Sequence, residues 1–281
     1  MRLSTWKIIL AALAVASLFL VSCDEESTEP EPTVFTPEPP TNLVATSIDN
    51  QTVRIKWDHS VDVNNAEFDH YELTVVGAGP TQPEIIGKNN NMGDIGSLDE
   101  GTVYTFELRS VSTDGELSTA ATVQWSPAGR YTFNESDYPI KVYNSNSSYG
   151  SGLNLYDEDT QTPTVWTVKD GEKWDIGLDT RDNGVKFGSA KLINYNYTND
   201  PVNTVEISSE VITGVSSLDE VFDSQALNAD PTKFQERIVD LTQYSENIVL
   251  IVRRMIPGES EYHYAKVFIP YQNGSFLTYD A

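Results

Sequence analysis

Apolar and polar side chains alternate in short segments over residues 40–127. The alternation is clearest at 52–57 and 68–76, and further apolar-rich segments lie at 43–45 and 104–111. Alternation with a period of two predicts half-buried β-strands, and several such strands separated by turns predict a β-sandwich. We therefore expect an all-β domain over these residues.

The same stretch resembles a fibronectin type III domain. The resemblance lies in the opening segment 39–43 (Pro-Pro-Thr-Asn-Leu), the strand-ending Trp57, the strand around Tyr71, and Leu98, Gly101 and Tyr104 as a tyrosine corner. It implies a sandwich with Trp57 and Tyr104 in the core. It also implies a spacer or an interaction surface rather than a domain that carries chemistry.

Strand signals continue over residues 128–281 without repeating the first pattern. Expected strands lie at 140–143, 164–168, 174–178, 185–187, 248–252 and 262–269. Residues 248–252 are continuously apolar, which predicts a strand buried on both faces. Residues 217–222 predict a short helix with Ser217 as its N-cap. The expected fold class is all-β: a fibronectin type III-like sandwich followed by a second, mostly antiparallel domain.

The N-terminus has the layout of a secretory signal over residues 1–22. Arg2 and Lys7 precede an apolar segment at 8–21, which is shorter than a transmembrane span of about 20 residues. Leu-Val-Ser before Cys23 resembles the bacterial lipobox, in which the cysteine becomes the lipidated first residue. We expect lipidation of Cys23 and attachment to a membrane through that lipid. The alternative is an ordinary signal or an uncleaved helix with an incidental cysteine.

Residues 23–39 are acidic and rich in proline, which predicts an extended tether. Acidic residues directly after the lipidated cysteine resemble the export signal of surface lipoproteins in Bacteroidetes-type bacteria. The resemblance implies an outer-membrane lipoprotein that faces the cell exterior rather than the periplasm. The alternative is a plain solvated spacer.

The net charge narrows the possible partners. The chain carries a formal charge of −24, and because residues 1–22 contribute two positive charges and no negative one, the remainder carries −26. Such a chain repels phosphate backbones, so we expect no nucleic acid partner. Cys23 is the only cysteine. Its lipidation leaves no disulfide, and stability must come from packed cores.

Residues 128–281 resemble the HmuY-like family of Bacteroidetes lipoproteins. The resemblance lies in 173–178 (Lys-Trp-Asp-Ile-Gly-Leu), the Asn183-Gly184 pair, the late strand at 247–254 and the final strand at 264–267. It implies a mostly antiparallel sheet domain and, in the best-known members of the family, haem capture.

Haem iron in such proteins is held by axial His or Met side chains. Within residues 128–281 only Met255 and His263 are candidates. A hairpin centred near Glu259 would place them opposite each other, with Cβ atoms about 5 Å apart. Such a pair could hardly reach iron from both faces of a porphyrin. His263 also shares its strand face with Ala265, Val267 and Ile269, which predicts a core or rim position. We therefore expect hemin to bind weakly or without two axial ligands.

Aromatic side chains among amides and carboxylates offer a second kind of site. They are Tyr143, Tyr149, Tyr156, Trp166, Trp174, Tyr195 and Tyr197. Exposed rings beside polar groups suit stacking on sugars. The alternation around Trp166 and Trp174 predicts core positions for both. Tyr149 is followed by Gly-Ser-Gly in a loop, which makes it the exposed candidate for glycan binding.

No catalytic residue is expected. The sequence has three histidines and lacks a Gly-x-Ser-x-Gly elbow, a His-Glu-x-x-His motif and a phosphate loop. We expect a binding or interaction role at the envelope and no enzymatic activity. Three classes remain open: capture of haem or a small ligand, glycan binding, and a structural or adhesive surface protein.

Overall fold

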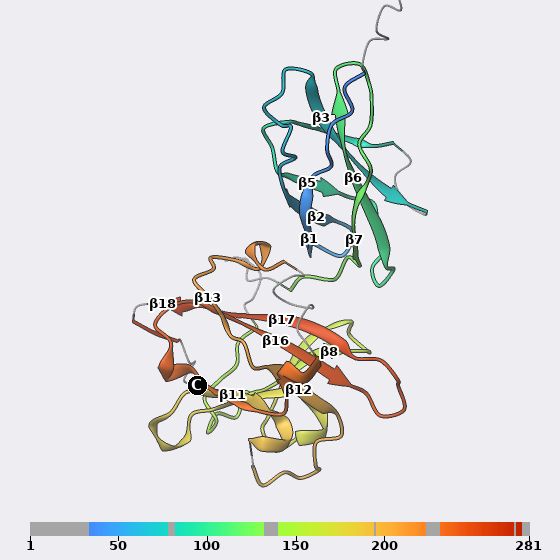
Figure 1. Cartoon of the computed structure of the whole chain (residues 1–281). Helices are drawn as coiled ribbons and strands as arrows, with labels where there is room; N and C mark the ends of the chain where they lie inside the picture. Colours follow the sequence, from blue (N-terminus) through green and yellow to red (C-terminus); the bar gives the residue numbers. More distant parts are fainter. Residues whose placement is uncertain are drawn as a thin grey trace, which may run out of the picture. The chain divides into compact units, whose positions relative to one another are not determined.

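The computed structural model describes residues 34–77, 82–131, 140–193, 195–222, 231–272 and 274–276. The chain divides into two units, Met1–Val34 and Phe35–Ala281. Cys23, the predicted signal and most of the predicted tether lie outside the described residues. Figure 1 shows two groups of strands, one coloured blue to green and one yellow to red.

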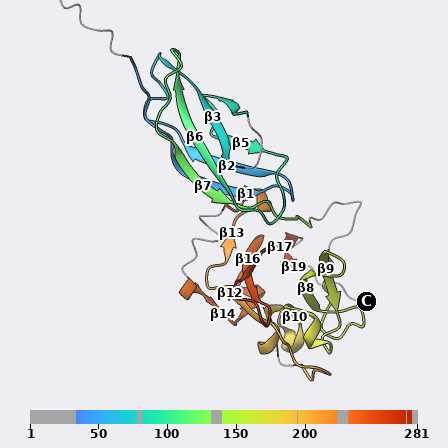
Figure 2. The ribbon, with the colours of Figure 1, turned by 90° about the vertical axis from the view of Figure 1, so that its right-hand side faces the viewer.

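The first group is a sandwich of two antiparallel sheets. One sheet has the order β1 (Thr41–Ser47), β2 (Val53–Asp58), β5 (Met92–Ile95). The other has the order β4 (Glu84–Gly87), β3 (Phe68–Val76), β6 (Tyr104–Ser112), β7 (Ala121–Trp125). Figure 2 shows these strands lying side by side. The strands predicted from alternation at 43–45, 52–57, 68–76 and 104–111 are confirmed.

Aromatic side chains fill the centre of this sandwich. Trp57 is 1% exposed, and its ring meets that of Tyr71 edge-on at 5.5 Å. Phe68 contacts Tyr71 in the same way at 5.1 Å. The Tyr104 hydroxyl accepts a hydrogen bond from the backbone N–H of Asp99 at 3.0 Å, which confirms the predicted tyrosine corner.

The second group also consists of antiparallel sheets. The first sheet has the order β15 (Ile238–Asp240), β11 (Lys186–Ser189), β10 (Ile176–Asp179), β8 (Gly152–Asp157), β9 (Thr162–Trp166). The second contains β17 (His263–Ile269), β16 (Ile248–Met255), β12 (Thr204–Ser208), β13 (Ile212–Thr213) and β14 (Phe234–Gln235). A small hairpin joins β18 (Tyr271–Gln272) to β19 (Ser275–Phe276).

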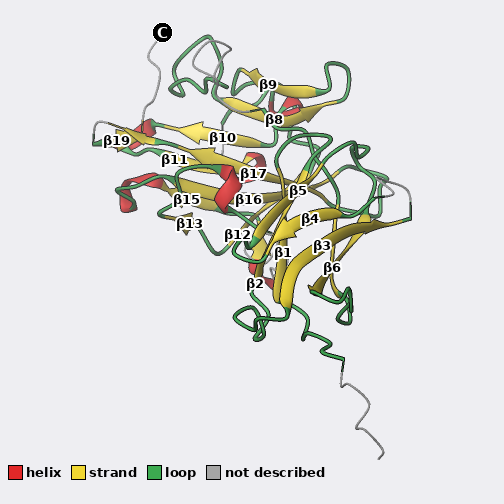
Figure 3. Ribbon diagram, turned by 90° about the horizontal axis from the view of Figure 1, so that it is seen from above, coloured by secondary structure: helices red, strands yellow, loops and turns green. Residues whose placement is uncertain are grey.

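The helices of the described residues are all short 3-10 turns, and no α-helix occurs among them (Figure 3). They are η1 (Gly171–Lys173), η2 (Arg181–Asn183), η3 (Ala190–Leu192), η4 (Leu218–Glu220), η5 (Pro231–Lys233) and η6 (Leu241–Gln243). None of these helices has the length or apolar character that crossing a membrane requires.

Strand β16 is buried on both faces, as its apolar run predicts. β17 pairs with one edge, and β12 and β13 pair in succession with the other. Ile248, Leu250 and Val252 belong to the core shared with the first sheet. Val249 and Ile251 belong to a separate cluster on the other face. The two larger sheets of this group share a core, and we call the group the second sandwich. Strand β16 lies at its centre.

A row of glycines crosses the first sheet of this sandwich. Gly152 pairs with Gly177, and Gly177 pairs with Gly188 on the next strand. A Cβ on Gly152 or Gly177 would lie 2.3 Å or 2.7 Å from the ring of Trp174. Gly152 and Gly177 thus leave the space that this ring occupies, and the ring is 2% exposed. The core position predicted for Trp174 is confirmed, whereas Trp166 is only partly buried.

Two predicted elements differ from the structure. Residues 140–143 form no strand; the N–H of Tyr143 instead donates to the carbonyl of Gly150 at 2.9 Å, which closes a loop. The helix predicted at 217–222 is only the three-residue η4, although the Ser217 side chain does cap it by accepting from Asp219 N–H at 3.2 Å. The predicted strand is thus a closed loop, and the predicted helix is a single 3-10 turn.

Candidate functional site

An open depression of about 300 Å³ lies in the second sandwich. Its lining comes from β8 and the turn after it, from η1, from the segment before β12 and from the end of β16. The lining residues are Asn154, Tyr156, Asp157, Glu158, Asp159, Glu172, Val202, Asn203, Arg254 and Ile256. The site therefore joins segments that are about 100 residues apart, such as Asn154 and Arg254.

A β-bulge in β8 shapes one wall. The pairing of β8 with β9 shifts register between Asn154 and Asp157. Within the bulge, the Leu155 N–H donates to the side chain of Asp175 at 2.9 Å, and the Tyr156 N–H donates to Asn154 Oδ1 at 3.1 Å. Bulges re-aim side chains and are common beside functional sites. Here the bulge satisfies its backbone through two side chains at the site.

A buried ion pair forms the floor. Arg254 Nη1 lies 3.0 Å from Asp175 Oδ2, with the two side chains 7% and 0% exposed. Arg254 Nη1 also donates to Asn154 Oδ1 at 3.1 Å, and Asn203 donates to Asp175 Oδ1 at 3.0 Å. A buried charge is costly unless it is paired and hydrogen-bonded. The carboxylate of Asp175 meets this requirement with donors from Leu155, Arg254 and Asn203.

Polar groups remain unused around this pair. Among the described residues no partner bonds to Nε or Nη2 of Arg254, and Arg254 is one of the residues that line the depression. Likewise, no described residue bonds to the amide N–H₂ of Asn154 or to the amide oxygen of Asn203, so both groups can bond to a ligand. Oε2 of Glu172 is buried without a hydrogen-bond partner in the described chain. The depression thus presents both donors and acceptors.

The acidic residues of the β8–β9 turn do not form a metal site. Asp157 Oδ1 accepts from the N–H groups of Asp159 and Thr160 at 3.0 and 3.2 Å, and its Oδ2 accepts from Thr164 at 3.3 Å. The turn therefore uses both oxygens of this carboxylate. Across the described ranges no group of three or more His, Cys, Asp or Glu side chains is arranged to hold a metal ion.

The predicted opposition of Met255 and His263 is wrong. His263 pairs with Arg254, and Met255 pairs on the other edge of β16 with Thr204. The β16–β17 hairpin is one residue out of the expected register. A slip of one residue moves a side chain to the other face of a strand, so Met255 and His263 point to opposite faces of the hairpin.

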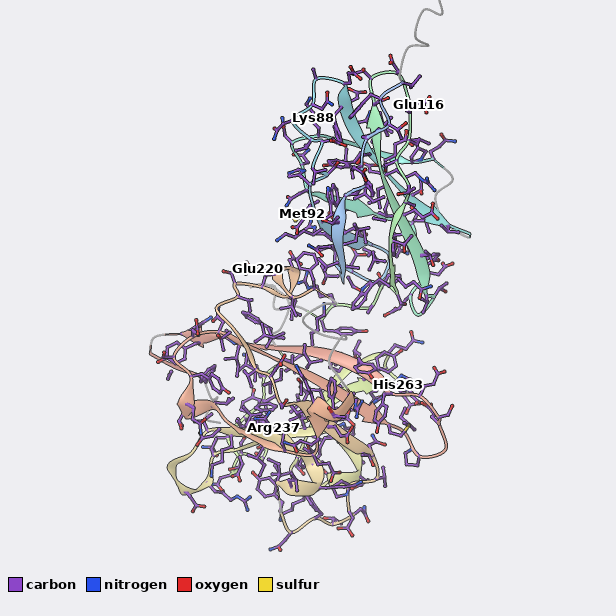
Figure 4. All side chains as sticks on the ribbon, in the orientation of Figure 1. Lys88, Met92, Glu116, Glu220, Arg237 and His263 are labelled. Atoms are coloured by element: carbon purple, nitrogen blue, oxygen red, sulfur yellow. The ribbon has the colours of Figure 1, made fainter. Side chains whose placement is uncertain are left out.

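His263, for which a core or a rim position was predicted, does not lie in the core. Its side chain is 54% exposed and bonds to Glu259 in the turn (Figure 4). Val267 and Ile269 on the same strand do pack against the core. The strand face was therefore predicted correctly, but His263 lies beyond the end of the core.

Tyr149 is exposed, as its loop position predicts, at 64%. Its ring stacks on Tyr143, with centroids 5.1 Å apart and an interplanar angle of 29°. Neither tyrosine lines the depression. The ring of Tyr197 packs edge-on against both Trp174 and Tyr195. The aromatic residues of the sequence thus fall into separate groups rather than one groove.

Of the residues that line the depression, sequence patterns pointed only to Tyr156. Asp175 stands between Trp174 and an apolar strand, and Arg254 continues the apolar run of β16. A charged residue beside or within a buried strand was the available signal, because such residues need a partner of opposite charge. Asn154, Asn203 and Glu172 carried no comparable signal.

The comparisons with known proteins concern the first sandwich. The model of the fibronectin type III domain matches residues 38–120, and these residues form such a domain. Strand β7 follows the matched range and completes the four-stranded sheet. Over its described residues the chain is all-β, with the fibronectin type III sandwich followed by further antiparallel sheets.

Similar solved structures include the fn3 domain of the human collagen alpha-1(XX) chain. It is 19% identical, with 36% of this chain and 94% of that chain covered and a TM-score of 0.30. The crystal structure of FN3tt is 20% identical, covers 34% and 98%, and has a TM-score of 0.27. A domain of human fibronectin type III domain containing protein 3 is 17% identical, covers 34% and 91%, and has a TM-score of 0.30. No curated protein matches the chain.

Proposed function

We propose that this chain is a lipid-anchored binding protein of the bacterial outer membrane, displayed at the cell surface. The lipobox-like sequence before Cys23 and the acidic residues after it support the anchor and the location. The fibronectin type III domain acts as a spacer, and the HmuY-like second sandwich carries the ligand site. The protein has no catalytic role in this proposal.

The observation that carries the binding role is the state of Arg254. Its side chain is only 7% exposed and its charge is balanced by Asp175, yet it lines the depression, and its Nε and Nη2 have no hydrogen-bond partner among the described residues. If a buried guanidinium served stability alone, we would expect all its N–H groups to donate hydrogen bonds to acceptors in the core. Ligand pockets usually combine an apolar or aromatic lining with a few convergent polar groups, and the depression has both kinds of side chain.

Haem is the ligand that the family resemblance implies, and the geometry does not favour it. Met255 and His263 lie on opposite faces of one hairpin, and His263 is bonded to Glu259. We expect hemin to bind without two axial ligands, and the Met255→Ala/His263→Ala double variant to leave the absorbance change on hemin addition nearly unaltered. A sharp low-spin spectrum that either substitution abolishes would contradict this.

Two measurements test the proposed function. Fractionation of cells should find the wild-type chain with outer membranes and Cys23→Ala in the soluble fraction. The purified chain should then be heated with a panel of saccharides, nucleosides, amino acids and hemin. At least one member should raise the unfolding temperature of the wild type but not of Tyr156→Ala. A chain found unlipidated, or one that no member of the panel stabilises, would overturn the proposal.

A further inference from the structure

The charge around the depression restricts its ligand. Asp175 neutralises Arg254, so the floor carries no net charge. The remaining charged groups of the lining are all carboxylates: Asp157, Glu158, Asp159 and Glu172. A ligand with a carboxylate, sulfate or phosphate would approach four negative charges. The site therefore suits a neutral or a positively charged ligand.

The polar groups of the lining are of both kinds. Arg254 and the Asn154 amide provide N–H donors, whereas the Asn203 amide provides an acceptor oxygen. A ligand that only accepts or only donates would leave some of them without partners. A hydroxyl group donates one hydrogen bond and accepts others, so neighbouring hydroxyls match such a set.

The lining also contains an aromatic ring and two aliphatic side chains. Tyr156 is 39% exposed, and Val202 is 56% exposed. Ile256 lies beside Arg254 at the end of β16. These groups offer apolar contact around a polar centre. A pyranose ring has the same division, with C–H groups on its faces and hydroxyls on its rim.

We infer that the depression binds a saccharide unit that is neutral or carries an amine, and that it rejects acidic sugars. This inference rests on the proposed binding function and names the ligand class of the same site. Tyr156 stacks on the sugar ring, Arg254 and Asn154 donate to its hydroxyls, and Asn203 accepts from them. An amine on the sugar is attracted by Glu172.

The test uses the full lipidated chain, purified from membranes in detergent. An array should present neutral oligosaccharides, amino sugars, and saccharides with uronic acid or sulfate groups. We expect retention on neutral or amino sugars and none on the acidic ones. Calorimetry with the best-retained sugar should show about tenfold weaker binding for Tyr156→Ala, which corresponds to about 1.4 kcal/mol.

Tyr149→Ala is the matched control. It removes an exposed tyrosine from the same domain but from outside the depression. Binding that Tyr149→Ala leaves unchanged and Tyr156→Ala weakens would support the inference. Glu172→Gln should remove any advantage of the amino sugar over its neutral counterpart, because the carboxylate charge that attracts the amine is gone.

Three results would overturn the inference. The first is binding that Tyr149→Ala abolishes and Tyr156→Ala does not, which would place the sugar on the Tyr143–Tyr149 stack. The second is preferential retention of acidic sugars. The third is a chain that binds no saccharide while another member of the thermal panel still stabilises it through Tyr156, in which case the proposed function would stand without this ligand class.

Discussion

The two sandwiches of the chain differ in how they treat charge. In the fibronectin type III sandwich the buried polar residues of the described chain are serines and threonines. All four buried charged residues in the described ranges lie in the second sandwich: Asp175, Asp179, Arg253 and Arg254. Burial of charge is costly unless each charge is paired and hydrogen-bonded, and only the second sandwich carries this cost among the described residues. We therefore propose a function beyond stability for the second sandwich.

The four buried charges are not equivalent. Arg253 stacks between the rings of Phe234 and Tyr262 at 4.5 and 4.1 Å and pairs with Glu206 at 2.6 Å. Asp179 is held by Arg181 at 2.8 Å. These two are explained by their immediate contacts. The pair of Asp175 and Arg254 alone borders the depression, which is why it carries the proposed site.

If the first sandwich depends on one apolar core, removal of its central ring should have the largest effect. Trp57→Ala in a fragment of residues 38–128 should lower the free energy of unfolding by about 3–5 kcal/mol, as for other buried aromatics. The wild-type fragment should unfold in one cooperative transition in urea. A fragment without such a transition would show that the first sandwich does not fold on its own.

In the second sandwich, a comparable loss of stability should follow from removing one buried charge. Asp175→Ala leaves Arg254 buried without its counter-charge, and should cost about 3–5 kcal/mol in chemical denaturation of the full chain. Asp94→Ala is the matched control, because Asp94 pairs with Arg54 at 2.7 Å but is 42% exposed. That change should cost no more than about 1 kcal/mol. Equal costs for both variants would remove the distinction between the two sandwiches.

The sequence predicted the first sandwich better than the second, for physical reasons. Alternation marks strands with one solvated face, such as β2 and β3, and the tyrosine corner is a local feature. The second sandwich buries several strands on both faces, so alternation disappears. The site depends on Asp175 and Arg254, which are 79 residues apart, and no local pattern encodes that pairing. The predicted register of the β16–β17 hairpin differed from the observed one by a single residue. The prediction therefore paired His263 with Met255 instead of Arg254.

The glycine row offers a sharper test of packing in the second sandwich. A Cβ at position 177 would lie 2.7 Å from the buried ring of Trp174, so Gly177→Ala should cost about 1–3 kcal/mol through overpacking. Gly87→Ala in β4 of the first sandwich is the control, because its Cβ would meet nothing within 4 Å. It should change stability by less than about 0.5 kcal/mol.

A second substitution separates overpacking from other effects of the Gly177 change. If the clash with the indole is the cause, the cost of Gly177→Ala should be smaller in a Trp174→Leu background, where the ring is absent. Denaturant midpoints of the two single variants and the double variant measure this coupling. Strict additivity would show that the glycine row does not serve to seat Trp174.

The smallest expected effect concerns Asp179, the buried carboxylate that is explained by its contacts with Arg181. It should appear as a dependence of stability on pH. Burial raises the pKa of Asp179, but hydrogen bonds from the side chain and backbone of Arg181 outweigh it and hold this pKa below its ordinary value. A carboxyl with a lowered folded-state pKa contributes stability above its unfolded pKa of about 3.9 and loses it as the pH falls through the folded value. Because the Arg181 side chain is 40% exposed, the contribution at neutral pH should be below about 1 kcal/mol.

Asp179→Asn should therefore lower the free energy of unfolding slightly at pH 7, and the difference from the wild type should shrink as the pH falls below about 4. In an Arg181→Gln background the hydrogen bonds that lower this pKa are gone while burial remains, so the same comparison should show a weaker dependence on pH. Denaturation curves of the wild type, the two single variants and the double variant at pH 7, 5 and 3 measure both effects. An unchanged dependence in the Arg181→Gln background would show that Arg181 does not control Asp179, and that the local explanation of this buried charge is wrong.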